Sequence, residues 1–204
     1  MIYELRIYTL KTGGVRELER RFGNNLEIRN KYSKMYGFWH TEIGQSSQVV
    51  HIWPYENLQD RVDSRAAANR DESHRWPPGI IEFFERQDVE ILKAASFMKP
   101  LEGEYGKVYE LITETFPPND VQDVLKAYSE AMPAREKIYP IAGIWHTDVG
   151  NQGCIRQIWM YKDWGHREEI MDALTEANWP PNLPVAPLTR ETRIMYPAAF
   201  SPLH

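Results

Sequence analysis

The sequence repeats itself, and this internal duplication constrains the fold more than any other feature. Residues 3–57 align without a gap with residues 109–163, starting from Tyr3 on Tyr109. Within that alignment the segment 37–44 matches the segment 143–150, and both contain Trp-His-Thr. A match of this length that depends on rare residues indicates two copies of one structural unit within the chain.

A Trp-Pro-Pro triplet marks the later part of each copy, at Trp76 and at Trp179. The interval between the triplets is three residues shorter than that between the copies' starts, so the second copy has lost three residues. Between the copies, the segment 99–104 has the proline, glycine and charged residues of a linker. We therefore predict two domains, residues 1–99 and 106–204, each an example of the same unit.

Each copy shows strand and helix patterns in the order β-α-β-β-α-β. Alternating apolar residues predict strands at 2–10, 38–43, 48–55 and 88–95, and in the second copy at 107–115, 144–149, 154–161 and 190–196. Helical spacing predicts helices at 14–35, 58–68 and 120–138, with Asn57 as the N-cap of the second. This order is that of the ferredoxin-like unit with an antiparallel sheet, and the fold class is α+β.

Composition excludes several classes of function. The net charge is -5 and no segment clusters lysine and arginine, so we expect no nucleic-acid partner. No apolar stretch approaches the ~20 residues that span a bilayer, so we expect no membrane partner. The strand pattern begins at Met1, which leaves no room for a signal peptide, and we expect a cytoplasmic protein. The single cysteine, Cys154, excludes an intrachain disulfide.

The strand patterns place the polar residues of the first copy on one face of its sheet, because successive side chains point to opposite faces. Tyr3, Leu5 and Ile7 would form the other face and pack on the helices. The polar face mixes charged groups with large aromatics, which favours a lined cavity over a bare wet surface. Its members are Glu4, Arg6, Tyr8, His40, Glu42, His51, Trp53 and Tyr55. A cavity would form where the two sheets of the repeat face each other.

His40 is the leading candidate for acid–base chemistry, because it recurs as His146 in the second copy and histidine titrates near neutral pH. We predict that the catalytic residues are His40, Glu42, Glu4 and Arg6, and that Tyr8, His51, Trp53, Tyr55, His146, Asp148, Glu110 and Trp159 bind substrate. The second copy would be an incomplete partner, since Ile112 and Gln157 replace Arg6 and His51. A structural His–carboxylate pair is the alternative interpretation.

Three other features have open interpretations. His40, Glu42 and His51 could bind a metal, although no supporting ligand spacing strengthens that view, and we predict no metal and no organic cofactor. Arg29 and Arg135 correspond between the copies and could bind an anionic group or form surface or helix-end ion pairs. Each Trp-Pro-Pro could cover a cavity or fill the core. The remaining histidines, His74, His166 and His204, are expected to be solvated.

Three segments carry a resemblance to a known family: Tyr3–Lys11, Gly37–Gly44 and Gln48–Tyr55. With the second copy, the chain resembles the NIPSNAP family, within the larger group of dimeric α+β barrel proteins. The resemblance implies two ferredoxin-like units that join their sheets into a barrel, often with dimerisation, so we expect a homodimer unless the repeat closes its own barrel. The wider group is similar to cofactor-free monooxygenases, isomerases, lyases and haem enzymes, an analogy of fold alone.

Two hypotheses of different classes follow. In the first, the protein is a small-molecule enzyme, of cofactor-independent monooxygenase, isomerase or lyase type, acting on a partly aromatic or carbonyl-bearing metabolite. That hypothesis predicts a deep cavity that ends at His40. In the second, the protein is a non-catalytic scaffold, which predicts a filled barrel and an exposed apolar patch. A metal- or haem-dependent oxygenase is a further alternative. The absence of a nucleophile elbow, a P-loop and a dinucleotide fingerprint excludes other common chemistries.

Overall fold

The computed structural model describes residues 1–73 and 75–204, which form eight strands and five α-helices among them. The first half contains β1 (Ile2–Leu10), α1 (Gly14–Gly23), α2 (Leu26–Asn30), β2 (Gly37–Ile43), β3 (Gln48–Tyr55), α3 (Leu58–Asn69), the 3₁₀ turn η1 (Ile81–Phe83) and β4 (Phe84–Ala94). The second contains β5 (Val108–Thr115), the 3₁₀ turn η2 (Pro118–Asp120), α4 (Val121–Ile138), β6 (Ile141–Val149), β7 (Cys154–Tyr161), α5 (Trp164–Glu176) and β8 (Thr189–Pro197). The expectation for His74 lies outside the described residues.

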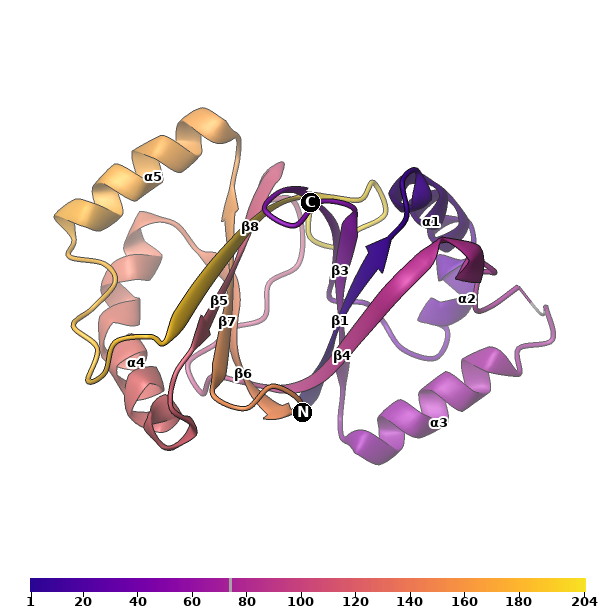
Figure 1. Ribbon diagram of the computed structural model, residues 1–204, viewed down its shortest axis with the longest axis horizontal. Coiled ribbons are helices and arrows are strands. Elements are labelled where there is room, and N and C mark those ends of the chain that lie inside the picture. The colour runs from indigo at the N-terminus through magenta and orange to yellow at the C-terminus, as the bar shows by residue number, and fades with distance from the viewer. Residues whose placement is uncertain (74) are drawn as a thin grey trace.

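The eight strands close into one antiparallel barrel in the order β1-β3-β2-β8-β5-β7-β6-β4. The helices lie outside the barrel, with α1, α2 and α3 on one side and α4 and α5 on the other (Figure 1). The two halves meet along two seams, where β2 pairs with β8 and β4 pairs with β6. The predicted α+β barrel is therefore confirmed, and a single chain closes it.

The predicted elements are nearly all present, although several of their bounds differ. The helix expected at 14–35 is two short helices, because the chain turns at Asn24 and Asn25, where the Asn25 side chain donates to the Arg21 carbonyl oxygen at 2.7 Å. Asparagine competes with the helix in this way through local hydrogen bonds. The strand expected at 88–95 begins earlier, at Phe84. Asn57 caps α3 as predicted, by accepting from the Asp60 amide at 3.0 Å.

The segment that follows each half's last strand crosses to the other half. Phe200, after β8, packs on Phe22 and Phe38 in the first half, with ring centroids 6.0 and 5.0 Å apart. Phe97, after β4, packs against the helix-side core of the second half. This exchange ties the two halves together beyond the hydrogen bonds of the seams.

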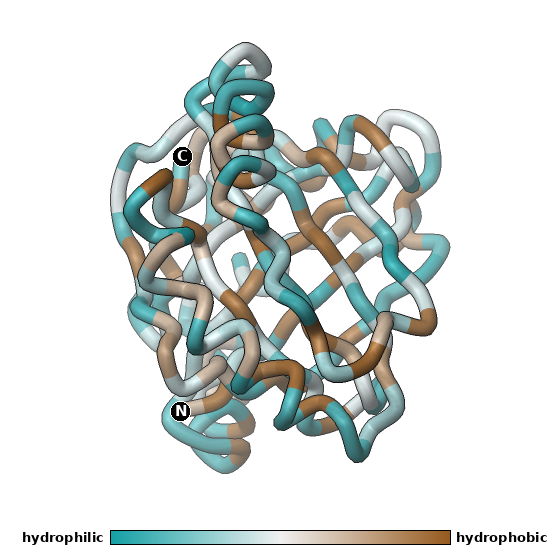
Figure 2. The backbone as a smooth tube through the Cα atoms, turned by 90° about the vertical axis from the view of Figure 1, so that its left-hand side faces the viewer, coloured by the Kyte–Doolittle hydropathy of each residue, from teal (hydrophilic) through white to brown (hydrophobic). Residues whose placement is uncertain are grey.

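The two faces of the sheet are the reverse of our expectation. Tyr3, Leu5 and Ile7 point into the barrel, where they pack with Trp39 and Trp145 in a continuous apolar core. The strands alternate between hydrophobic and hydrophilic residues around this closed wall (Figure 2). An eight-stranded barrel is just wide enough for its own side chains to fill, so this interior excludes a ligand along most of its length. The polar face lies outside, beneath the helices.

Candidate functional site

A cavity of about 370 Å³ lies between the outer face of the first half's sheet and its helices. Strands β1 and β3 supply Arg6, Tyr8, His51 and Trp53, because these residues alternate with the apolar residues of the barrel interior. The helices, the segment before β4 and the start of β4 supply the rest of the wall: Leu18, Phe22, Arg29, Arg65, Asn69, Trp76, Pro77, Pro78, Gly79, Ile80, Ile81, Phe84 and Gln87. Four of the predicted site residues therefore line one cavity.

Glu4 is fully buried beside this cavity and is held by three arginines. Its carboxylate accepts from Arg6 Nη1 and Arg61 Nη2, each at 2.6 Å, and Arg65 lies 3.6 Å away. Burial alone raises the pKa of a carboxyl group, but these arginines outweigh it and hold the pKa of Glu4 below its ordinary value. Glu4 is therefore a permanent counter-ion and a poor proton acceptor at neutral pH.

His51 is buried at the cavity wall as a neutral imidazole. Its Nδ1 accepts a hydrogen bond from Trp53 Nε1 at 2.7 Å, which assigns the proton to Nε2. Burial and, after it, the charges of Arg6, Arg65 and Arg29 hold the pKa of His51 well below its ordinary value. Among the described residues, the buried Nε2 has no hydrogen-bond partner. His51 thus presents an unsatisfied N–H donor.

Arg29, from α2, adds a second incompletely satisfied donor. Its guanidinium lies 4.7 Å from the Trp53 ring and donates from Nη2 to the Tyr55 hydroxyl at 2.7 Å. Its Nη1 is buried without a partner among the described residues. Burial lowers the pKa of Arg29, which means that its charge is incompletely compensated. Of the two interpretations given for this arginine, the surface ion pair is wrong, since the side chain is buried.

The corresponding place in the second half is filled by its own side chains. Glu114 stands where Tyr8 is in the first half, and it accepts from Tyr128 Oη at 2.7 Å and from Gln157 Nε2 at 3.1 Å. Trp159 donates to Gln157 as Trp53 does to His51. Trp179 packs on Tyr128 and Trp159, at 5.6 and 6.2 Å between ring centroids. The two interpretations of Trp-Pro-Pro are therefore each realised once: Trp76 borders a cavity and Trp179 fills a core.

Three more of the predicted substrate-binding residues make contacts within the protein: Glu110, Trp159 and Tyr55. Glu110 repeats the environment of Glu4, because it accepts from Tyr161 at 3.0 Å and from Arg167 at 3.1 Å. Tyr55 lies within 3.5 Å of Glu4. Trp159 is buried beneath Arg135, whose guanidinium lies 4.8 Å from its ring.

His40 lies outside the cavity, so the expected cavity that ends at His40 is wrong. Its Nδ1 is 2.7 Å from Glu19 Oε1 of α1, and this hydrogen bond raises the pKa of His40 despite partial burial. Glu42 is exposed at the end of β2. The physical reason for the separation is the register of β2 with β3, in which His40 lies opposite Val49 and Phe38 is the residue opposite His51.

His146 and Asp148 are equally separate from the cavity. Burial, and after it the charge of Lys93, lowers the pKa of His146, and Lys93 Nζ pairs with Asp148 at 2.8 Å. Within residues 1–73 and 75–204, no group of three histidine, cysteine or acidic side chains is placed to hold a metal ion. The candidate metal set of His40, Glu42 and His51 therefore finds no support in the geometry.

Sequence reasoning missed the arginines of α3. Arg61 and Arg65 are four residues apart, so they share one face of the helix that begins after Asn57. That face of the helix covers the polar face of the sheet. Because the charge of Glu4 needs a counter-ion, Glu4 could have pointed to these two arginines. Glu19 was missed because it lies on the edge of the apolar stripe of α1.

Comparison with known proteins agrees with the fold and the duplication. The model of the NIPSNAP family matches residues 3–99 and again residues 109–202. The chain belongs to the NIPSNAP family. It is 28% identical to mouse protein NipSnap homolog 3B and 26% identical to the human one, over 98% of this chain and 85% of each relative.

Solved structures share the NIPSNAP chain's barrel at low sequence identity. One from Lactobacillus acidophilus NCFM has a TM-score of 0.66 at 10% identity and covers 97% of this chain and 93% of that chain. An anthrone oxidase-like protein has a TM-score of 0.60 at 8% identity, over 96% of this chain and 90% of that chain. These likenesses show the fold alone. Within the described part of this NIPSNAP chain, no helix has the length and apolar character needed to cross a bilayer.

Proposed function

We propose that the first half of this NIPSNAP protein binds a small organic anion with an apolar or aromatic body in the cavity lined by Arg6, Arg29, His51 and Arg65. The observation that carries the proposal is a pair of buried donors at this cavity that have no partner among the described residues, His51 Nε2 and Arg29 Nη1. Leaving a buried donor unpaired costs about 1–3 kcal/mol, more for a charged group, and a ligand acceptor would recover that cost.

Charge favours an anionic ligand. Three arginines line the cavity, none of its described lining residues is acidic, and Glu4 behind the wall is shared among Arg6, Arg61 and Arg65. A carboxylate suits a guanidinium especially well, because two parallel hydrogen bonds can form. Positive charge that is already partly desolvated gains more from an anion than an exposed arginine would.

The remaining wall favours an apolar or aromatic ligand body. Phe22 and Trp76 meet at 4.9 Å between ring centroids, and Trp53 and Phe84 complete an aromatic enclosure. A cavity of about 370 Å³ lies within the range of small-molecule sites. Together the wall and the donors describe a site for a compact aromatic or aliphatic acid.

The same groups limit the chemistry that the cavity supports. Neutral His51 and the arginines can stabilise negative charge that develops on a carbonyl oxygen, as in an oxyanion hole. Glu4 is held ionised by its arginines, and His51 Nδ1 already accepts from Trp53, so neither is well placed to remove a proton. We therefore propose that the cavity binds its ligand, and that the chemistry it supports is polarisation of a ligand carbonyl group by His51. Transformation of the ligand without an organic cofactor is the more specific form of this proposal.

Calorimetric titration with matched acids and amides tests the proposal. We expect benzoate and phenylacetate to bind the wild-type protein and neutral benzamide to bind at least tenfold more weakly. Arg29→Gln should weaken benzoate binding about 10- to 100-fold, the loss of one charge-assisted hydrogen bond. Arg70→Gln, at the exposed end of α3, is the matched control. Equal affinity for benzoate and benzamide, or no effect of Arg29→Gln, would contradict the proposal, and no binding at all would favour the scaffold hypothesis.

A further inference from the structure

A second cavity, independent of the first, opens at one end of the barrel. The inward-facing residues change from apolar to polar towards this end: Tyr3, Leu5 and Ile7 of β1 are followed by Thr9, and Ile158 of β7 is preceded by Arg156. The resulting cavity, which we call the barrel mouth, has a volume of about 630 Å³. Its polar lining includes Thr9, Gln48, Glu90, Arg156, Glu191 and Arg193.

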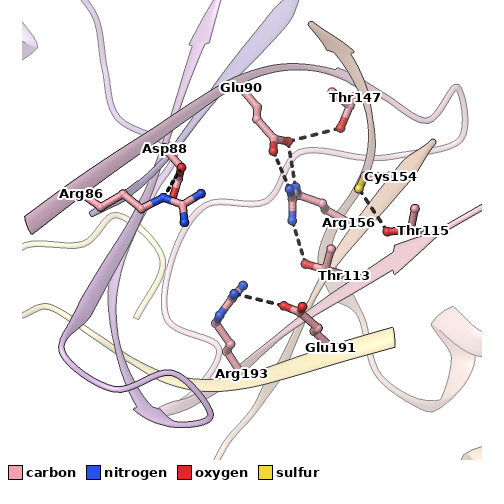
Figure 3. A network of polar contacts seen from close by, with 10 residues as sticks. All are labelled: Arg86, Asp88, Glu90, Thr113, Thr115, Thr147, Cys154, Arg156, Glu191 and Arg193. Carbon is pink, nitrogen blue, oxygen red and sulfur yellow. Dashed lines mark hydrogen bonds and ion pairs between the residues drawn. The ribbon is translucent and has the colours of Figure 1, made fainter. Parts of the chain in front are cut away.

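One side of the barrel mouth is closed by a buried ion pair. Arg156 reaches Glu90 with two hydrogen bonds, Nη2 to Oε1 at 2.7 Å and Nε to Oε2 at 3.2 Å, and it also donates to Thr113 Oγ1 at 2.8 Å (Figure 3). Thr147 donates to the same carboxylate at 3.3 Å. The side chains of Arg156 and Glu90 are 7% and 15% exposed. The hydrogen-bonding groups on this side are therefore satisfied within the protein and offer little to a ligand.

The internal repeat shows what the other side lacks. The register of β4 with β6 and of β8 with β2 makes Leu92 the counterpart of Met195, and so Glu90 the counterpart of Arg193. Arg156 corresponds in turn to Val50, at the 106-residue interval of the repeat. Where one side has an arginine matched to a glutamate, the other has Arg193 and, at the position that corresponds to Arg156, the apolar Val50 of the barrel core.

Arg193 is consequently a cation with weak compensation. Its side chain is 14% exposed, and its ion pair at 3.2 Å is with Glu191, whose side chain is 63% exposed (Figure 3). Burial, together with the nearby charge of Arg156, lowers the pKa of Arg193, and the charges of Glu191 and Asp88 offset this only in part. An exposed carboxylate contributes little to such a pair, so a ligand anion could displace Glu191 at small cost.

An unpartnered acceptor lies in the same cavity. Gln48 is 2% exposed, and its Nε2 donates to Thr9 Oγ1 at 2.9 Å. Its Oε1 is buried without a hydrogen-bond partner among the described residues. A buried amide oxygen in this state would accept a hydrogen bond from a hydroxyl or ammonium group of a ligand.

We propose that the barrel mouth is a second binding site, for a small hydrophilic carboxylate that carries a neighbouring hydroxyl or ammonium group. The carboxylate would pair with Arg193 and the neighbouring donor would reach Gln48 Oε1. The lining separates this ligand class from that of the first cavity, because threonine, glutamine and ion-paired side chains surround the barrel mouth where aromatic rings surround the other.

Arginine-detected NMR on the full chain tests this site. We expect glycolate and glycine to shift the Arg193 Nε–H signal along a saturating curve, and acetate, which lacks the second donor, to bind about 3- to 10-fold more weakly, as expected for one hydrogen bond. In Gln48→Leu, glycolate should fall to the affinity of acetate while acetate is unchanged. Arg70→Gln, far from the barrel mouth, should bind all three as the wild type does.

Arg193→Gln should abolish saturable binding of glycolate, with circular dichroism to show that the barrel is folded. If that variant does not fold, Gln48→Leu decides by its separation of glycolate from acetate. Shifts that never saturate, saturable shifts that survive in Arg193→Gln, or equal affinities for glycolate and acetate in the wild type would each overturn the proposal.

Discussion

At the scale of single residues, burial and neighbouring charge determine the protonation states of Glu4 and His51. The sequence correctly placed both on one polar face, because strand alternation depends only on residue order. It could not show which face meets the helices. Alternation divides the side chains of a strand between two opposite faces, but it does not say which face a closed barrel turns inward. The roles first given to His40 and Glu42 depended on a second unknown, the register of β2 with β3, which pairs His40 with Val49 rather than with His51.

The state of His51 makes a prediction about pH. Its pKa is lowered in the folded protein, so its contribution to stability is present above the unfolded-state value of 6.5 and is lost as the pH falls towards the folded value. We expect the free energy of unfolding to decrease there with a limiting slope of about 1.4 kcal/mol per pH unit from this one group. Urea unfolding between pH 5 and 7.5 measures the slope.

His51→Gln, which copies the second half's Gln157, should flatten that decrease. His40→Gln is the contrasting variant, because the pKa of His40 is raised and its contribution is present at low pH and lost as the pH rises through the folded value. Removing His40 should therefore steepen the profile rather than flatten it. A wild-type profile that His51→Gln leaves unchanged would show that His51 binds protons equally in the folded and unfolded states, which would contradict a lowered pKa.

At the scale of elements, strand positions and the caps of helices were predictable because they depend on local sequence. Asn57 and Asp163 occupy the same position in the two copies and cap α3 and α5 with hydrogen bonds of 3.0 and 2.9 Å. The break between α1 and α2 was missed, because the apolar spacing continues across Asn24 and Asn25 although the backbone does not. That break places Arg29 over Trp53, so it matters for the site.

The cap of α3 gives a prediction at this scale. Asn57→Ala should lower the free energy of unfolding by about 1 kcal/mol, the usual cost of losing an N-cap side chain. Because α3 also holds Arg61 and Arg65 against Glu4, benzoate affinity should fall as well. Asp163→Ala, the matched change in the second half, should cost similar stability and leave benzoate affinity unchanged. Chemical denaturation and titration of both variants measure these effects, and equal losses of affinity would contradict the account.

At the scale of the whole molecule, duplication lets one chain close the barrel. It also allows the two halves to differ in sequence, because each half is encoded separately within that chain. The seams between β2 and β8 and between β4 and β6 use the edges through which two separate units would associate. A homodimer, which the resemblance led us to expect, would therefore have to use the helices or the barrel ends. From the sequence, the sign that the first half is hollow and the second half filled was the replacement of Arg6 and His51 by Ile112 and Gln157.

Separating the halves tests the role of the seams. Residues 1–99 and 106–204, expressed singly, should self-associate or aggregate, because each would expose two strand edges and half of the apolar barrel interior. Expressed together, they should form a one-to-one complex of the size of the intact chain, measured by size-exclusion chromatography with light scattering. Two stable, folded monomers would contradict this view of the barrel.

The central claim is that the first half holds a ligand cavity where the second half holds a closed network of side chains. The most direct test converts one into the other with the four changes Arg6→Ile, Tyr8→Glu, Phe22→Tyr and His51→Gln, which recreate the arrangement of Ile112, Glu114, Tyr128 and Gln157. Calorimetric titration with benzoate should give one site per chain in the wild type and none in this variant, with cooperative unfolding retained. Unchanged benzoate binding by the folded variant would place the site elsewhere and contradict the claim.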